Sequence, residues 1–218
     1  MWWKIVLVVA VVAGGWYLSA PPRLASDEIV LPAVEPGPGP GLSVDSGPLQ
    51  EAPEFWLAPI AAGDFKLLPV ARFEVEGRVL SRRAYRRGRM SELSPFDLAL
   101  GWGPMASDEA AEIVRVEQGA RFARVSAREP DMPSGMVAQN FANIHIIPAG
   151  QQIRDELAGI GPDDSVRLAG YLVDAHAGPE WFWETSRTRS DTGPGACEIL
   201  LVTHVSQAGG RQGGKSGT

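Results

Sequence analysis

The segment SVRLAGYLVDAH, residues 165–176, begins the part of the chain that decides the fold. It is a long apolar run interrupted by Gly170, and it leads through the aromatic stretch WFWE, residues 181–184, into the apolar run EILLVTHV, residues 198–205. Short apolar runs rich in β-branched and aromatic residues, separated by glycine and proline, are typical of strands. The sequence therefore predicts strands over 166–173, 181–184 and 198–205.

The upstream half of the domain predicts more strands and two short helices. Strands are expected over 70–80 with a bend at Gly77, over 113–118 and 122–126 joined across Gly119, and over 143–149. Ser94-Pro95 resembles a helix start, with the helix ending at Gly101, and 151–160 has apolar residues at helical spacing. We expect a mainly β domain, specifically a small OB-like Greek-key barrel with one or two short helices. An open antiparallel α+β sheet is the alternative.

The N-terminus predicts a membrane anchor over residues 1–20. Residues 5–20 form a run of sixteen residues without a charge, and aromatic residues flank it at Trp2, Trp3, Trp16 and Tyr17. Its helical length of ~24 Å is slightly below the ~30 Å of a bilayer core. A cleaved signal peptide is the alternative. With an uncleaved anchor, we expect a single-pass protein of the bacterial cytoplasmic membrane, its N-terminus inside and its globular domain outside.

Composition divides the remainder into three parts. Residues 21–53 hold eight prolines and four glycines and predict a disordered linker. Residues 54–207 are expected to form one globular domain, and the glycine-rich residues 208–218 a disordered tail. The formal net charge of −6 argues against a general nucleic-acid binder, because phosphate binding needs a cationic face.

One stretch nevertheless carries a local excess of positive charge. Residues 70–90 contain seven arginines against two glutamates. Arginine binds phosphate and carboxylate groups bidentately, and a tyrosine among the arginines is suited to stacking on a ring. We expect an anionic partner here, such as a lipid head group, a cell-wall polymer or an acidic protein; a solvated loop whose arginines pair with nearby acids is the alternative. The residues proposed to bind are Arg82, Arg83, Tyr85, Arg86 and Arg87.

The loop SRTRSDTGPGACE, residues 186–198, is a second candidate site. Asp191 and Thr192 suit a tight turn, and Arg187 and Arg189 alternate with Thr188. We assign Arg187, Arg189, Asp191 and Thr192 to the same binding surface. A specialised β-hairpin, in which these residues only satisfy backbone geometry, is the alternative.

The single cysteine suggests a catalytic alternative. Cys197, His145 and an acid, Asp191 or Glu198, are of the types that form a thiol nucleophile, a base and an orienting carboxylate. A buried cysteine that behaves as a small hydrophobe is the plainer interpretation. The three histidines show no metal-ligand spacing, and the glycine patterns of phosphate-binding loops do not occur, so no metal or cofactor is predicted.

Four blocks resemble an uncharacterised family of bacterial membrane-anchored proteins that carry them in this order. The resemblance spans most of residues 73–205, implies no activity, and supports only the domain limits and the choice of residues. The blocks are LSPFDLALGWGPM (93–105), NIHIIPA (143–149), RLAGYLV (167–173) and SRTRSDTGPGACEI (186–199). On balance the sequence favours a noncatalytic, membrane-tethered binding module, with a Cys/His-dependent hydrolase or transferase as the alternative.

Overall fold

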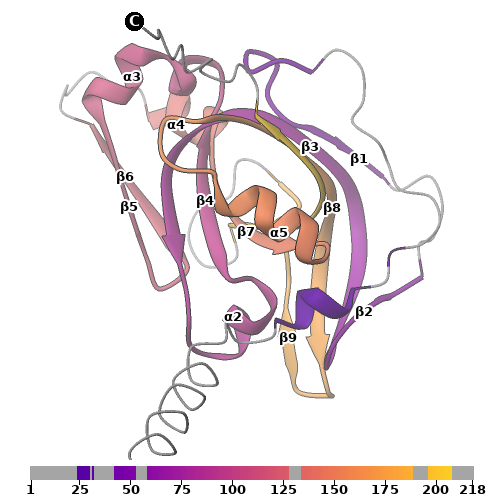
Figure 1. Cartoon of the computed structure of the whole chain (residues 1–218). Helices are drawn as coiled ribbons and strands as arrows, with labels where there is room; N and C mark the ends of the chain where they lie inside the picture. Colours follow the sequence, from indigo (N-terminus) through magenta and orange to yellow (C-terminus); the bar gives the residue numbers. More distant parts are fainter. Residues whose placement is uncertain are drawn as a thin grey trace, which may run out of the picture.

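The computed structural model describes residues 24–29, 31, 42–52, 58–127, 134–188 and 196–207. The strands are β1 (Leu49–Glu51), β2 (Ile60–Ala62), β3 (Phe65–Ala84), β4 (Phe96–Gly101), β5 (Val114–Gly119), β6 (Phe122–Ala127), β7 (Phe141–Pro148), β8 (Ser165–Ala177), β9 (Trp181–Trp183) and β10 (Glu198–Gln207). The helices are η1 (Ala25–Glu28), α2 (Arg89–Leu93), η2 (Gly103–Ala106), α3 (Asp108–Ile113), α4 (Ser134–Asn140) and α5 (Gln151–Ala158), and Figure 1 shows their arrangement.

Five strands form a ring. Hydrogen-bonded neighbours follow the order β3, β4, β7, β10, β8, and β8 pairs again with β3. Every pair in the ring is antiparallel except β7 with β10, which is parallel. Helix α5 lies between the third and fourth strands of the ring along the chain, as an OB-like barrel requires. The expectation of a mainly β, OB-like barrel is confirmed.

Strand β3 closes the ring because it is long enough to pair with two strands, β8 and β4. Its first part pairs with β8 as far as Arg78 opposite Ser165, and from Arg78 onward it pairs with β4. The change of partner takes place one residue after Gly77, where the sequence predicts a bend. A Cβ atom at Gly77 would lie 2.9 Å from the carbonyl oxygen of Gly101, so only glycine lets the two strands approach this closely.

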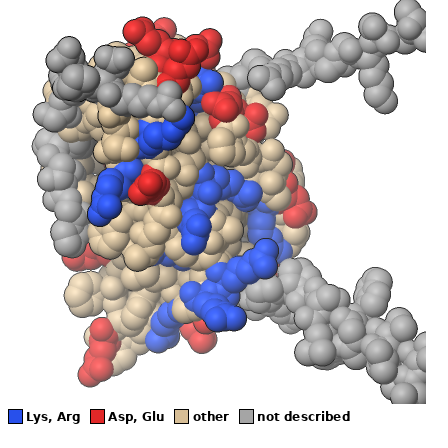
Figure 2. Space-filling model, turned by 90° about the vertical axis from the view of Figure 1, so that its left-hand side faces the viewer, with Lys and Arg blue, Asp and Glu red and all other residues tan. Residues whose placement is uncertain are grey.

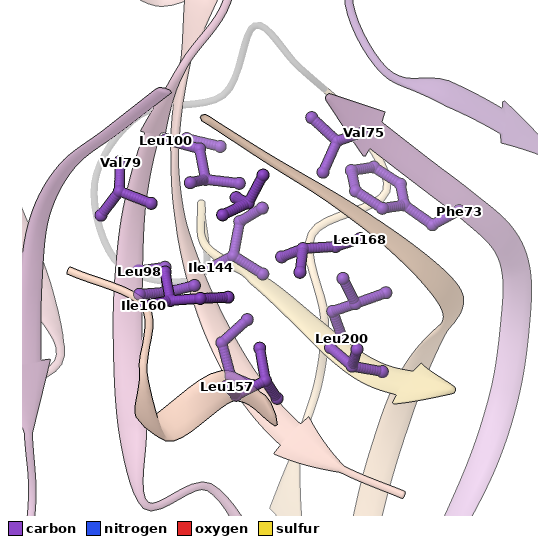
Figure 3. Packing of buried hydrophobic residues seen from close by; sticks show 14 of the residues in the cluster. Phe73, Val75, Val79, Leu98, Leu100, Ile144, Leu157, Ile160, Leu168 and Leu200 are labelled. Carbon is purple, nitrogen blue, oxygen red and sulfur yellow. The ribbon is translucent and has the colours of Figure 1, made fainter. Parts of the chain in front are cut away.

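The interior of the barrel is filled by one apolar cluster. Alternate residues of the ring strands point inward, and Figure 3 shows Phe73 and Val75 of β3, Leu98 of β4 and Ile144 of β7 converging on one another. Leu157 of α5 belongs to the same cluster, so the helix covers one end of the barrel. Trp102 is also buried in this cluster, and its ring nitrogen donates a 3.0 Å hydrogen bond to the carbonyl oxygen of Gln139.

A second apolar cluster lies on the opposite face of the same strands. Ile147, Val173, Ile199 and Leu201 alternate with the inward-facing residues and are covered by β2, β9 and η1. Two of the covering or edge elements, η1 and β1, fall within residues 21–53, which the sequence predicts as a disordered linker. Strand β1 pairs with β3, and apolar residues next to η1 pack against this cluster.

The helix expected to start at Ser94-Pro95 is wrong, because residues 96–101 form β4. All six residues of β4 are buried. Phe96, Leu98 and Leu100 point into the barrel, and Asp97 and Ala99 lie on the other face. A strand buried on both faces lacks the alternation of polar and apolar residues that marks a half-exposed strand, so local helix-start signals outweighed it in the sequence.

The other expected elements agree with the structure. The β5–β6 hairpin, β7, α5, β8, β9 and β10 all lie where they are predicted. The anchor predicted over residues 1–20 lies outside the described residues. Within the described ranges, no helix has the length and apolar character that crossing a membrane requires.

Candidate functional site

A pocket of about 360 Å³ lies on the outer face of the barrel, beside β7 and β10. The β3–β4 connection contributes Met90, the turn of the β5–β6 hairpin contributes Arg121 and Phe122, and β7 contributes His145. The remaining wall comes from the β8–β10 connection, with Phe182, Trp183 and Glu184, and from Cys197 immediately before β10. Chain segments that are distant in sequence therefore form one site.

The floor of the pocket holds a buried aspartate–histidine pair. His145 Nδ1 lies 2.9 Å from Asp97 Oδ1, and the two side chains are 4% and 0% exposed. An ionised carboxylate only accepts hydrogen bonds, so this contact requires Nδ1 of His145 to carry the proton. In a neutral imidazole the other nitrogen, Nε2, then holds the free electron pair. The Trp183 ring packs against the imidazole with centroids 4.7 Å apart.

Arg121 forms an ion pair with the same carboxylate. Its Nη1 atom donates to Asp97 Oδ1 at 2.8 Å, and its Nη2 atom donates to the carbonyl oxygen of Ser94 at 2.8 Å. The guanidinium also stacks on the Tyr85 ring at 3.9 Å from the centroid. Aspartate at this depth requires a paired charge, and Arg121 supplies it.

Arg121 reaches Asp97 because of an unusual turn. Gly119 pairs with Phe122, so Ala120 and Arg121 are the two central residues of the β5–β6 hairpin. Both have positive φ angles, 49° and 68°, as a type I′ turn demands. Neither residue is glycine or asparagine, so the backbone of the turn is strained. Backbone strain of this kind is concentrated at functional sites.

Tyr85 joins the β3–β4 connection to this cluster. Its hydroxyl oxygen accepts a 3.2 Å hydrogen bond from the backbone N–H of Arg121. Burial raises the pKa of Tyr85, and the negative charge of Asp97 raises it further. Tyr85 is therefore a partly buried member of the site and differs from the exposed ring that its arginine-rich surroundings suggested.

Cys197 is half-buried at the edge of the pocket. Its Sγ atom accepts a hydrogen bond from Asn143 Nδ2 at 3.6 Å and donates to the carbonyl oxygen of Arg121 at 3.8 Å. Cys197 and His145 thus line one pocket, as their assignment to one catalytic group requires. The carboxylate that contacts His145 is Asp97, and sequence reasoning missed it. A lone acid in the apolar run FDLALG is the signal that could have identified it, since unpaired acids are rarely buried.

Five of the seven arginines in the arginine-rich stretch fall into two groups. Arg78 forms ion pairs with Asp108 and Asp163, at 2.7 and 2.8 Å. Arg82 stacks on the Phe96 ring at 4.6 Å, and burial lowers its pKa. Both arginines therefore have partners within the fold, and Arg82 is partly buried.

Arg83, Arg86 and Arg87 form the other group, which we call the arginine loop. All three are exposed, and none forms an ion pair with another residue in the described ranges. Arg86 and Arg87 lie in the connection that also supplies Tyr85 and Met90 to the site, and Arg83 lies at the end of β3 just before this connection. Lys and Arg side chains gather over the middle and lower part of the face in Figure 2, the side on which the β5–β6 hairpin lies in Figure 1.

Of the binding residues predicted in the 186–198 loop, the structure describes Arg187. Arg187 Nη2 lies 2.5 Å from Asp174 Oδ2 on β8, and this ion pair connects the start of the loop to the barrel. Ser186 and Thr185 also form internal hydrogen bonds at this point. Arg189, Asp191 and Thr192 lie outside the described residues.

Two exposed aromatic rings flank the pocket. Among the described residues only three large apolar side chains are exposed, and two of them, Phe122 at 48% and Phe182 at 64%, line this pocket. Phe122 comes from the β5–β6 hairpin and Phe182 from β9. Hydrophobic and aromatic side chains are the usual lining of ligand pockets.

Comparison with models of known protein families, and with curated protein sequences, finds no match to the chain. Within the parts that the structure describes, no group of three or more His, Cys, Asp or Glu side chains is placed to hold a metal ion.

Proposed function

We propose that the chain is a binding module that takes an anionic glycan in the pocket beside the arginine loop. The observation that carries this proposal is the meeting of two exposed phenylalanine rings with a loop of exposed, unpaired arginines. Aromatic rings stack on the apolar faces of sugar rings, and arginines bind carboxylate or phosphate substituents. An uncharged sugar chain would leave the arginine loop without a partner.

The position of the pocket on the fold supports the same proposal. It lies over β7, the third strand of the ring along the chain, between the β3–β4 connection and the β8–β10 connection. OB-folds bind oligosaccharides and oligonucleotides on the corresponding face. This support is an analogy of fold, and the chemistry of the site must decide the ligand.

The expected location selects glycan over nucleic acid. Residues 5–20 are uncharged and apolar, which favours an anchor in the cytoplasmic membrane with the domain outside. An extracytoplasmic domain meets anionic cell-wall polymers. The net charge of −6 also disfavours tight binding to a polyphosphate backbone outside the local cationic face.

The test measures binding of the full chain, in detergent micelles, to oligogalacturonate by isothermal titration calorimetry. Arg86→Glu together with Arg87→Glu is expected to abolish binding. The matched control is Lys66→Glu together with Arg115→Glu, which makes the same change of charge at exposed residues that do not line the pocket. Phe122→Ala with Phe182→Ala is expected to weaken binding at least tenfold.

Three results would overturn the proposal: no binding of oligogalacturonate by the wild type, equal losses in the two charge-reversed variants, or tighter binding of oligothymidylate than of the glycan. Absence of binding would rule out an anionic glycan as the ligand. Equal losses would show that the arginine loop contributes only nonspecific charge. Tighter binding of oligothymidylate would identify the site as a surface for single-stranded nucleic acid.

A further inference from the structure

We infer that Cys197 is a nucleophile activated by the His145–Asp97 pair, and that the pocket accepts an acyl group for transfer from an ester to water. This inference is independent of glycan binding, because it rests on the floor and edge of the pocket and not on the arginine loop. The groups required are a thiol, a base and a carboxylate that orients the base.

The residues that contact His145 fix its tautomer and its orientation. Asp97 Oδ1 fixes the proton of His145 on Nδ1, at 2.9 Å, and leaves Nε2 as the proton acceptor. The ring is held in place on one face by Trp183 and at its edge by Asp97, whose own position is fixed by Arg121. A carboxylate that holds the imidazole in one tautomer also stabilises the imidazolium that forms when Nε2 takes a proton.

The thiol lies on the same wall as the base. Strands β7 and β10 run parallel with Ile199 opposite His145, and Cys197 lies immediately before β10. Both residues line the pocket. The side-chain amide of Asn143 donates to Sγ, and a donor to sulfur favours the thiolate. Gln118 Nε2 in turn donates to Asn143 Oδ1 at 2.7 Å, which orients this amide.

Charged groups from every adjoining element act on this thiol and imidazole. Arg121 of the β5–β6 turn is positive; Asp97 of β4, Glu184 after β9 and Glu198 of β10 are acidic; Tyr85 of the β3–β4 connection is a neutral phenol at pH 7. Arg121 and Asp97 neutralise one another in their ion pair. Of these groups, His145 is the one that can take the thiol proton, because it lines the same pocket as Cys197 and its Nε2 atom holds the free electron pair.

The reaction is balanced by these groups and water. His145 Nε2 takes the thiol proton, and Sγ attacks the ester carbonyl to form a C–S bond. The C–O bond then breaks, the alcohol leaves with the proton from His145, and Cys197 holds a thioester. A water molecule gives its proton to His145 and attacks the thioester, and the thiol is regenerated as the carboxylic acid is released.

The competing interpretation assigns these residues to packing alone. On that view Arg121, Asp97 and His145 clamp the hairpin to the barrel, and Cys197 fills space. A purely structural cluster requires no thiolate, so the rate at which Cys197 is alkylated separates the two interpretations.

The first experiment follows alkylation of the full chain by iodoacetamide across about pH 5 to about pH 9. Cys197 is the only cysteine, so labelling reports a single site. Activation predicts a labelling midpoint well below the value of about 8.5 for a free thiol. His145→Gln is expected to slow labelling at pH 7 at least tenfold, whereas His176→Gln, which changes a histidine that does not line the pocket, should leave it unchanged.

The second experiment supplies 4-nitrophenyl acetate and detects the acetyl group on Cys197 by mass spectrometry, with continuing release of nitrophenol. Cys197→Ser should abolish both. A wild-type midpoint at or above the free-thiol value, labelling only after denaturation, or absence of the acetyl adduct would each overturn the inference. The wild-type measurements need no variant to fold. Because oligogalacturonate binding is measured separately, failure here leaves the proposed binding function standing, and the reverse is also true.

Discussion

Arg121 at the tip of the β5–β6 hairpin forms a buried ion pair with Asp97 on β4, with Nη1 and Oδ1 2.8 Å apart. The aspartate is fully buried and the arginine side chain is 13% exposed. The hairpin is a separate two-stranded sheet that does not join the ring. Its position over the pocket therefore depends on side chains, and this ion pair is the most deeply buried of those connections.

Removing the arginine should destabilise the protein. Arg121→Ala leaves the Asp97 carboxylate buried with His145 as its remaining polar partner, and loss of one member of a buried pair costs about 3 kcal/mol or more. Arg124→Ala, at an exposed position on the same hairpin, should change the free energy of unfolding by less than about 0.5 kcal/mol. Urea unfolding of the two variants measures the difference. Equal stabilities would show that the hairpin is held by its other contacts.

The strained turn that presents Arg121 allows a stabilising substitution. Ala120 has a φ of 49°, which asparagine tolerates better than alanine. Ala120→Asn is expected to raise the free energy of unfolding by about 0.5–1 kcal/mol, and Ala120→Val to lower it by at least about 1 kcal/mol, because β-branched residues resist this conformation. Thermal denaturation tests both. Destabilisation by asparagine would contradict the turn geometry.

How far the sequence predicts this fold depends on whether a segment carries its own periodic signal. Residues 166–173 and 151–160 do, and the structure confirms both elements and the helix position that marks an OB-like barrel. Residues 96–101 do not, because a strand buried on both faces shows no alternation, and the local Ser-Pro start signal pointed to a helix. Local sequence patterns therefore do not predict the secondary structure of a segment whose burial depends on strands that are distant in the sequence.

The site shows the same limit more sharply. Cys197 and His145 could be chosen by residue type, but Asp97 lies in the misassigned segment, and its contact with Arg121 spans 24 residues of sequence. The arginines also could not be sorted from sequence. Arg78 and Arg82 contact acids and a ring that the barrel brings near, whereas Arg83 at the end of β3 and Arg86 and Arg87 after it are exposed. Which side chains contact one another depends on how the closed ring brings distant strands together, so neighbouring residues in the sequence do not reveal these contacts.

Tyr85 predicts a pH dependence at alkaline pH. Burial and the charge of Asp97 raise the pKa of Tyr85 above its unfolded value of about 10, so the neutral phenol is favoured in the folded chain. The corresponding stability is fully present below about pH 10 and is lost as the pH rises through the folded pKa. Tyr85→Phe loses the hydrogen bond from the Arg121 N–H, at a cost of about 1 kcal/mol near neutral pH.

The difference in unfolding free energy between wild type and Tyr85→Phe should therefore shrink above about pH 10, since phenylalanine cannot ionise. Urea unfolding from about pH 7 to about pH 11 measures it. A difference that stays constant across this range would mean that the phenol titrates alike in the folded and unfolded chains.

Gly170 tests the closure of the barrel itself. A Cβ atom at this position would lie 1.9 Å from the carbonyl oxygen of Leu201 and 3.2 Å from the backbone nitrogen of Thr203, so β8 and β10 could not keep their pairing. Because both neighbours are backbone atoms, no side chain can move aside. Gly170→Ala is expected to cost about 3 kcal/mol or more, at the upper end of the range for overpacking.

Gly161→Ala is the matched control, since a Cβ atom there would meet nothing within 4 Å. Thermal unfolding should show a large drop in Tm for Gly170→Ala and little change for Gly161→Ala. The pocket supplies a second readout, because Cys197 lies directly before β10, and loosening of that strand should expose it. Faster alkylation of Cys197 in Gly170→Ala at temperatures well below its Tm is expected, and equal rates in both glycine variants would show that the β8–β10 pairing does not control access to the thiol.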